Sequence, residues 1–141
     1  MKIAICGSMS FIDEMEAIAA DLRAHVEAVF TPVREEGDLD WDSLPLEQAV
    51  DRKRGYLLGY LEQIRACDGV LIANFEKHGV AGYVGPNTLV EAAFAHAAGK
   101  PVAFLNPPGP QPARLEALAM MTICLDGGGA AIPAWAAGLA P

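Results

Sequence analysis

A chain of 141 residues, 52% of them apolar, has the length of a single domain with a sizeable core, and we expect one domain over residues 1–141. Its formal net charge of −8 disfavours binding to a nucleic-acid polymer, because such binding relies on a basic surface that releases counterions from the phosphates. The expected partner is therefore a small molecule and not a nucleic-acid polymer.

Strand and helix patterns alternate along the chain without an internal repeat. Short apolar runs predict strands at residues 2–6, 26–30, 69–73, 101–105 and 121–125. Apolar residues at helical spacing predict helices at residues 11–25, 46–67 and 114–119, and a further helix that opens near Pro86, Asn87 and Thr88. Repeated strand and helix units with buried strands imply an α/β fold, with a parallel sheet, right-handed crossovers and helices on both faces.

Two segments carry no strong pattern of their own. Residues 31–46 are acidic and rich in turn formers, and we interpret them as an ordered loop or a lid that Trp41 anchors. The Gly- and Ala-rich tail that contains Trp135 has no predicted helix or strand.

Composition also bears on location and cofactors. No stretch approaches the roughly 20 apolar residues needed to span a bilayer. Three cysteines without CxxC spacing favour free thiols in a reducing compartment, so we expect a cytoplasmic protein with neither a disulfide nor a zinc site. His78 and His96 show no metal-ligand pattern, and the chain has neither a GxGxxG motif nor a Walker A loop, so we expect no metal and no cofactor.

The first strand-to-helix turn reads Cys-Gly-Ser-Met-Ser, from Cys6 to Ser10. A glycine there lets backbone amides approach a ligand, serine hydroxyls add donors, and the N-terminus of the following helix attracts an anion such as a phosphate. The alternative is an ordinary turn in which Ser10 caps the helix.

Glu91 is the most informative candidate residue. It lies in the first turns of the helix that opens near Pro86, and open parallel sheets bind ligands where strands end and helices begin. A carboxylate among amides and hydroxyls near a helix N-terminus is expected to stay ionised, which suits a nucleophile. The alternative is structural, because Thr88-x-x-Glu91 fits a capping box in which Glu91 reaches back to the N-cap amide. Polar residues predicted on the pocket side are Asp68, Asn74, Tyr83, Asn87, Thr88 and Asn106.

Four short runs in the chain resemble one family. They are C-G-S at residues 6–8, C-D-G-V-L-I-A-N at 67–74, G-Y-V-G-P-N-T-L-V-E-A-A-F-A at 82–95 and G-K-P-V at 99–102. Over residues 1 to about 106 the chain resembles the nucleoside 2-deoxyribosyltransferase-like family, which also includes deoxynucleoside 5'-monophosphate N-glycosidases. The resemblance implies a flavodoxin-like (Rossmann-like) five-stranded sheet of order 2-1-3-4-5. It also implies a homo-oligomer, a dimer or larger, in which a neighbouring subunit helps complete the site.

The resemblance places the role of nucleophile on Glu91. It also implies that Asp68 and Asn74 lie near the sugar or base, and that residues 7–9 lie near the nucleoside or its phosphate. The predicted catalytic residues are Glu91, Asp68 and Tyr83. The predicted substrate-binding residues are Gly7, Ser8, Met9, Asn74, Gly85, Asn87, Thr88 and Asn106.

The implied reaction is attack of Glu91 on the anomeric carbon of a 2-deoxyribosyl group of a small nucleoside or nucleotide, through a glycosyl-enzyme intermediate. If water attacks the intermediate in the second step, the protein is a hydrolase; if a second base attacks it, the protein is a transferase. Transferases of the family often carry an acidic residue six positions before the nucleophile, where this chain has Gly85. They also often carry an aromatic residue on the first strand, where this chain has none, and Tyr83 is the candidate to compensate.

Two further interpretations stay open. The basic cluster at residues 52–54, with Lys77 and His78 in the later loop, is either a receptor for a 5'-phosphate or a solvated surface. The alternative function for the whole chain is a noncatalytic nucleotide-binding or sensing module, in which Glu91 only caps its helix.

Overall fold

The computed structural model describes residues 1–34 and 40–139. Within this part of the chain, five strands form one sheet, in which every pair is parallel and the order is β2-β1-β3-β4-β5. The strands are β1 (Lys2–Cys6), β2 (Ala28–Phe30), β3 (Gly69–Ile72), β4 (Val102–Phe104) and β5 (Ile123–Cys124). The parallel α/β fold and the flavodoxin-like strand order are confirmed, and the predicted strands are all present, with every strand except β1 shorter than predicted.

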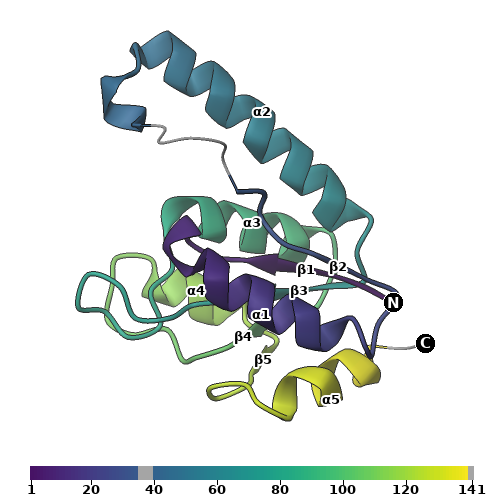
Figure 1. Ribbon diagram of the computed structural model, residues 1–141. Helices are drawn as coiled ribbons and strands as arrows, with labels where there is room; N and C mark the ends of the chain where they lie inside the picture. The colour runs from purple at the N-terminus through teal and green to yellow at the C-terminus, as the bar shows by residue number, and fades with distance from the viewer. Residues whose placement is uncertain (35–39, 140–141) are drawn as a thin grey trace.

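Helices cover both faces of the sheet (Figure 1). One face carries α1 (Ile12–Leu22), which follows a short 3-10 turn η1 (Met9–Phe11), and α5 (Ala131–Gly138). The other face carries α2 (Leu46–Arg65), α3 (Pro86–Ala97) and α4 (Arg114–Met120). Because both faces are covered, the central strands β3 and β4 are buried along their whole length, which explains their continuous apolar runs.

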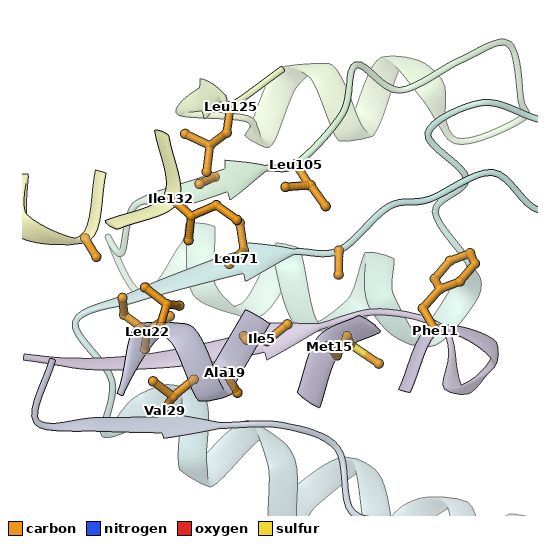
Figure 2. Close-up of a cluster of buried hydrophobic side chains, with 14 of the residues drawn as sticks. Ile5, Phe11, Met15, Ala19, Leu22, Val29, Leu71, Leu105, Leu125 and Ile132 are labelled. Atoms are coloured by element: carbon orange, nitrogen blue, oxygen red, sulfur yellow. The ribbon is translucent and has the colours of Figure 1, made fainter. Parts of the chain in front are cut away.

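The alternation of side chains along β1 divides the core into two clusters. Ile3 and Ile5 point to the face of α1, where Met15 and Leu22 pack against them (Figure 2). Cys6 points to the opposite face, with the buried side chains of α2 and α3. The last residue of β1 therefore presents its side chain toward α3, the helix that carries Glu91.

The tail contains the helix α5, whereas the sequence predicted neither a helix nor a strand there. Its sequence, AIPAWAAG, is apolar on every side and so lacks the periodicity that marks an amphipathic helix. The helix is stabilised by tertiary packing, since Ile132 and Ala136 are buried against the sheet.

The helix α2 extends well past the edge of the sheet (Figure 1). Of its 20 residues only Ile64, near its C-terminal end, is buried, and Tyr60 and Leu61 pack against the same core cluster from partly buried positions. The turn η2 (Trp41–Ser43) lies against the projecting half: the Trp41 ring is 6.2 Å from that of Tyr56, and the Lys53 Nζ is 4.8 Å from the Trp41 ring centre. Trp41 therefore anchors the segment as expected, while residues 35–39 of the predicted loop or lid lie outside the described residues.

Within residues 1–34 and 40–139, no helix combines the length and the apolar character needed to cross a membrane.

Candidate active site

A cavity of about 760 Å³ lies at the carboxyl ends of β1 and β3, between α2 and α3. The chain leaves β1 toward β2 on one side, and the remaining strands lie on the other, so this is the point at which the strand order reverses. Open α/β sheets bind small ligands at such a point. The predicted site residues that line the cavity are Gly7, Ser8, Met9, Tyr83, Gly85, Asn87, Thr88 and Glu91.

The turn after β1 brings Gly7 and Ser8 to the cavity. A Cβ atom on Gly7 would lie 2.9 Å from the Met15 Sδ and 3.0 Å from the Ala73 carbonyl oxygen, so only a glycine fits where this turn passes between α1 and β3. Ser8, and not Ser10, is the N-cap of η1, because its Oγ accepts from the Ser10 amide at 3.3 Å. The Lys77 Nζ donates to the same Oγ at 2.8 Å, which places a cation beside this turn.

Glu91 lines the cavity from the second turn of α3, and it does not cap that helix. The N-cap is Gly85, Pro86 occupies the first helical position, and the described residues provide no side-chain capping bond. Thr88 is a buried residue inside the helix, so the capping-box alternative for Glu91 is wrong. The Glu91 Oε2 is buried and has no hydrogen-bond partner among the described residues.

Burial raises the pKa of Glu91 from its ordinary value of 4.5 to about 7, while the Cys6 thiol beside the carboxylate and the Lys53 ammonium oppose the rise. The expectation that Glu91 stays ionised is therefore not met near pH 7, where both forms are present. Burial, and then the Glu91 carboxylate, raises the pKa of Cys6, so that thiol stays protonated and can donate to the carboxylate. The groups that favour the ionised form of Glu91 are therefore a thiol and an ammonium, and not the amides that the sequence suggested.

Tyr60, an aromatic residue that the sequence did not single out, lines the cavity from α2. Its hydroxyl donates to the Ile5 carbonyl at the end of β1, and burial raises its pKa, so the phenol is neutral. Tyr56 and Gln63 are further lining residues that the sequence did not single out. They share one face of α2 with Tyr60 and with Lys53, which belongs to the basic cluster already considered for a phosphate. Helical spacing groups these four residues, and only the packing of α2 shows that this face lines the cavity.

Tyr83 lies over Gly85 at the start of α3. The Tyr83 Cε1 is 3.4 Å, and its hydroxyl 3.6 Å, from the point that a Cβ atom on Gly85 would occupy. The ring is also 5.4 Å from that of His78, and the Lys77 Nζ lies 5.6 Å from the ring centre. The loop thus brings an aromatic hydroxyl beside the start of α3.

Asn74 and Asn106 do not line the cavity, although the sequence analysis assigned them to substrate binding. They bind each other across the ends of β3 and β4. The Asn106 amide donates to the Asn74 Oδ1 at 2.9 Å, the Asn74 Nδ2 donates to the Asn106 carbonyl at 2.6 Å, and the Asn106 Nδ2 donates to the Asn74 carbonyl at 3.1 Å. The pair holds the two loops together, and both polar atoms of the Asn74 side chain are used in these hydrogen bonds.

The prediction that Asp68 lies on the pocket side is wrong. Asp68 directly precedes β3, and in a parallel sheet the residue before a strand lies at the amino edge, opposite the cavity. Its carboxylate accepts from the Lys2 amide at 2.7 Å, at the start of β1. This contact satisfies the first amide of β1, and Asp68 does not line the cavity.

The basic cluster divides between the cavity and the surface. Lys53 and Lys77 line the cavity, whereas Arg52 and Arg54 are exposed and Arg54 pairs with Asp51 at 2.8 Å. His78 is exposed in the loop with a φ of 53°. Among the residues that the structure describes, no three His, Cys, Asp or Glu side chains gather in positions to hold a metal ion.

The fold and the cavity define a class, an α/β protein with a cavity at the point of strand reversal and a buried glutamate oxygen in that cavity. No family model and no curated protein sequence matches the chain. A solved structure of a 2-deoxyribosyltransferase from Bacillus psychrosaccharolyticus is similar, with a TM-score of 0.51 and 19% sequence identity, over 79% of this chain and 76% of that chain. The resemblance seen in the sequence is therefore matched by a likeness of fold.

Proposed function

We propose that the protein cleaves the N-glycosidic bond of a small deoxynucleoside or deoxynucleoside 5'-monophosphate, with Glu91 as the nucleophile. The observation that carries this proposal is the buried Glu91 Oε2, which has no hydrogen-bond partner among the described residues although the residue lines a cavity. Buried polar atoms are nearly always paired, so an unpaired carboxylate oxygen in a cavity marks a site prepared for a ligand. The similar fold of a 2-deoxyribosyltransferase supports the class of substrate.

In the proposed first step a carboxylate oxygen of Glu91 attacks the anomeric carbon. The bond between that carbon and the base nitrogen breaks, and its electron pair leaves with the base, which takes a proton from water. In the second step a water oxygen attacks the same carbon, the bond to Glu91 breaks, and the carboxylate is regenerated as a proton passes to solvent.

Hydrolysis is favoured over transfer to a second base. Transfer needs a group that binds and protonates the incoming base, and position 85, where related transferases often carry an acidic residue, is a glycine covered by the Tyr83 ring. Tyr83 supplies a hydroxyl to the sugar or base from that position. Transfer is the alternative outcome of the same glycosyl-enzyme.

A 5'-phosphate is supported by the cations in the cavity. Lys77 lies beside Ser8 and the start of η1, and Lys53 lies on the opposite wall, on α2. Two ammonium groups and a helical turn that begins at the cavity would stabilise a dianion. We therefore propose that monophosphates bind more tightly than the corresponding nucleosides.

The test is to incubate the protein with a panel of deoxynucleosides and their monophosphates and to measure released base by chromatography. Glu91→Gln removes the nucleophile with little change in shape and is expected to abolish release. Glu116→Gln changes an exposed glutamate on α4 and is expected to leave release unchanged. Release from no substrate, or equal release by Glu91→Gln, would contradict the proposal, and binding without release would favour the noncatalytic nucleotide-binding module.

We also propose a cytoplasmic homo-oligomer that associates through α2. The three cysteines are free thiols, which suits a reducing compartment. The projecting part of α2 exposes the apolar residues Leu46, Val50, Tyr56 and Leu58, and a neighbouring copy that covered them would also narrow the cavity.

Light scattering in solution tests the assembly. Leu58→Glu, at a residue 57% exposed on α2, is expected to reduce the mass to that of a monomer, whereas Leu115→Glu, 77% exposed on α4, is expected to leave the mass unchanged. A monomeric wild-type protein would contradict the assembly.

A further inference from the structure

Gln111 lies in the turn between β4 and α4 and does not line the cavity. Its side-chain amide nevertheless makes three hydrogen bonds to backbone groups. The Oε1 accepts from the Val84 amide at 2.9 Å, and the Nε2 donates to the carbonyls of Gly82 at 3.0 Å and Gly109 at 3.1 Å. Since Gly82 and Val84 flank Tyr83, one side chain holds both chain neighbours of a residue that lines the cavity.

The chemistry of the contact selects a side-chain amide. The segment on either side of Tyr83 offers one carbonyl and one N–H, so its partner must both accept and donate, as a primary amide does. A carboxylate of the same shape has no donor, and a methionine of similar length has neither a strong donor nor a strong acceptor. The reverse orientation of the Gln111 amide would set its oxygen against two carbonyl oxygens, which fixes the observed orientation.

The loop that carries Tyr83 packs directly against the loop that carries Gln111. A Cβ atom on Gly82, whose φ is +64°, would collide with the Pro107 carbonyl oxygen, and a Cβ atom on Gly109 would collide with the Ala81 carbonyl oxygen. The Gly109 amide donates to that same Ala81 carbonyl at 2.8 Å. The backbones of the two loops are therefore in contact, and Gln111 completes the contact on the side of Tyr83.

We infer that Gln111 is a positioning residue, which fixes Tyr83 at the rim of the candidate active site without contacting the substrate. This inference rests on the proposed function of that site. Because Tyr83 covers Gly85 and lies next to Lys77, a shift of its backbone would move its hydroxyl away from the start of α3. Misplacing a substrate-contacting group by about 1 Å can cost up to roughly 100-fold in rate.

The kinetic test is a double-mutant cycle on base release. Gln111→Met keeps the size of the side chain and removes its hydrogen bonds, and it is expected to lower kcat/KM roughly 10- to 100-fold. Tyr83→Ala is expected to cause a similar loss, and in the Tyr83→Ala background Gln111→Met is expected to cause little further loss, because both changes remove the same group. Gln48→Met, at an exposed glutamine of α2, serves as the matched control and is expected to leave kcat/KM unchanged.

A second measurement does not depend on catalysis. Amide exchange followed by nuclear magnetic resonance is expected to be at least about tenfold faster at Val84 in Gln111→Met than in the wild type, with shifted Tyr83 ring signals. Gln48→Met is expected to change neither. If no substrate releases base, the proposed function is wrong and the exchange result alone decides on Gln111. Unchanged exchange at Val84, or fully additive losses in the kinetic cycle, would overturn the inference.

Discussion

The Tyr83 ring occupies the space beside Gly85, with its Cε1 only 3.4 Å from the point where a Cβ atom on residue 85 would lie. Gly85 is also the N-cap of α3, the helix that carries Glu91. The absence of a side chain on Gly85 therefore leaves room for the Tyr83 ring beside the start of this helix.

The two glycines beside Tyr83 are expected to respond very differently to a methyl group. Gly85 has an ordinary extended backbone, and the nearest atoms to a Cβ atom placed on it lie at 3.4 Å or more. Gly85→Ala should therefore change the free energy of unfolding by less than about 1 kcal/mol. Gly82→Ala combines a φ of +64° with a collision against the Pro107 carbonyl and should cost at least about 2 kcal/mol. Urea denaturation of both variants measures this difference, and equal stability of the two would show that the loops repack freely.

The pH dependence of base release is expected to follow Glu91. A nucleophile must be ionised, and burial raises the pKa of Glu91 to about 7, so kcat/KM should fall about tenfold for each pH unit below that value and level off above it. Initial rates at low substrate concentration, from about pH 5 to about pH 9, check this profile. Rates that instead fell as the pH rose through 7 would mean that Glu91 acts as a general acid.

Stability is expected to change with pH through the same carboxyl. Because the pKa of Glu91 is raised from 4.5 to about 7 in the folded protein, its contribution is fully present below pH 4.5 and is lost as the pH rises to about 7. The loss amounts to about 3 kcal/mol. Glu91→Gln lacks this titration, so its free energy of unfolding relative to the wild type should rise by about that amount between these pH values. Parallel pH profiles for the two proteins in chemical denaturation would contradict the raised pKa.

Lys53 is expected to tune the nucleophile from α2. Its ammonium lowers the pKa of Glu91, so Lys53→Met should move the midpoint of the rate profile to higher pH, while Lys53→Arg keeps a positive charge and should move it less. Arg52→Met, at an exposed neighbouring cation, is the control and should leave the midpoint in place. An unshifted midpoint in Lys53→Met would mean that solvent screens Lys53 from the carboxylate.

Much of the fold could be predicted from the sequence because its signals are local. The strands β1, β3 and β4 are short apolar runs, and a parallel sheet covered on both faces buries such runs completely. The helix α5 could not be predicted in the same way, since it is apolar on every side and only contact with the sheet separates its buried side from its exposed one.

The candidate site was predicted in part for a similar reason. Gly7 and Glu91 follow β1 and β3 along the chain, so the topology alone brings them to one edge of the sheet. The same rule places Asp68 at the opposite edge of the sheet, because Asp68 precedes β3. The order of residues in the sequence was therefore sufficient to exclude Asp68 from the pocket. Tyr60 was not predicted, because it lies on α2 and no local motif shows which face of that helix lines the cavity.

By itself, the sequence determined the parallel α/β class, the position of Glu91 at the carboxyl edge of the sheet and the glycines that shape the surrounding turns. These follow from hydrophobic patterns and chain order, which are properties of neighbouring residues. Only the tertiary structure decided that Glu91 is buried with a raised pKa, that Tyr60 and Lys53 face it from α2, and that Gln111 holds the loop of Tyr83. Burial, charge proximity and long-range hydrogen bonds depend on which distant segments pack together, and that is settled only when the whole chain folds.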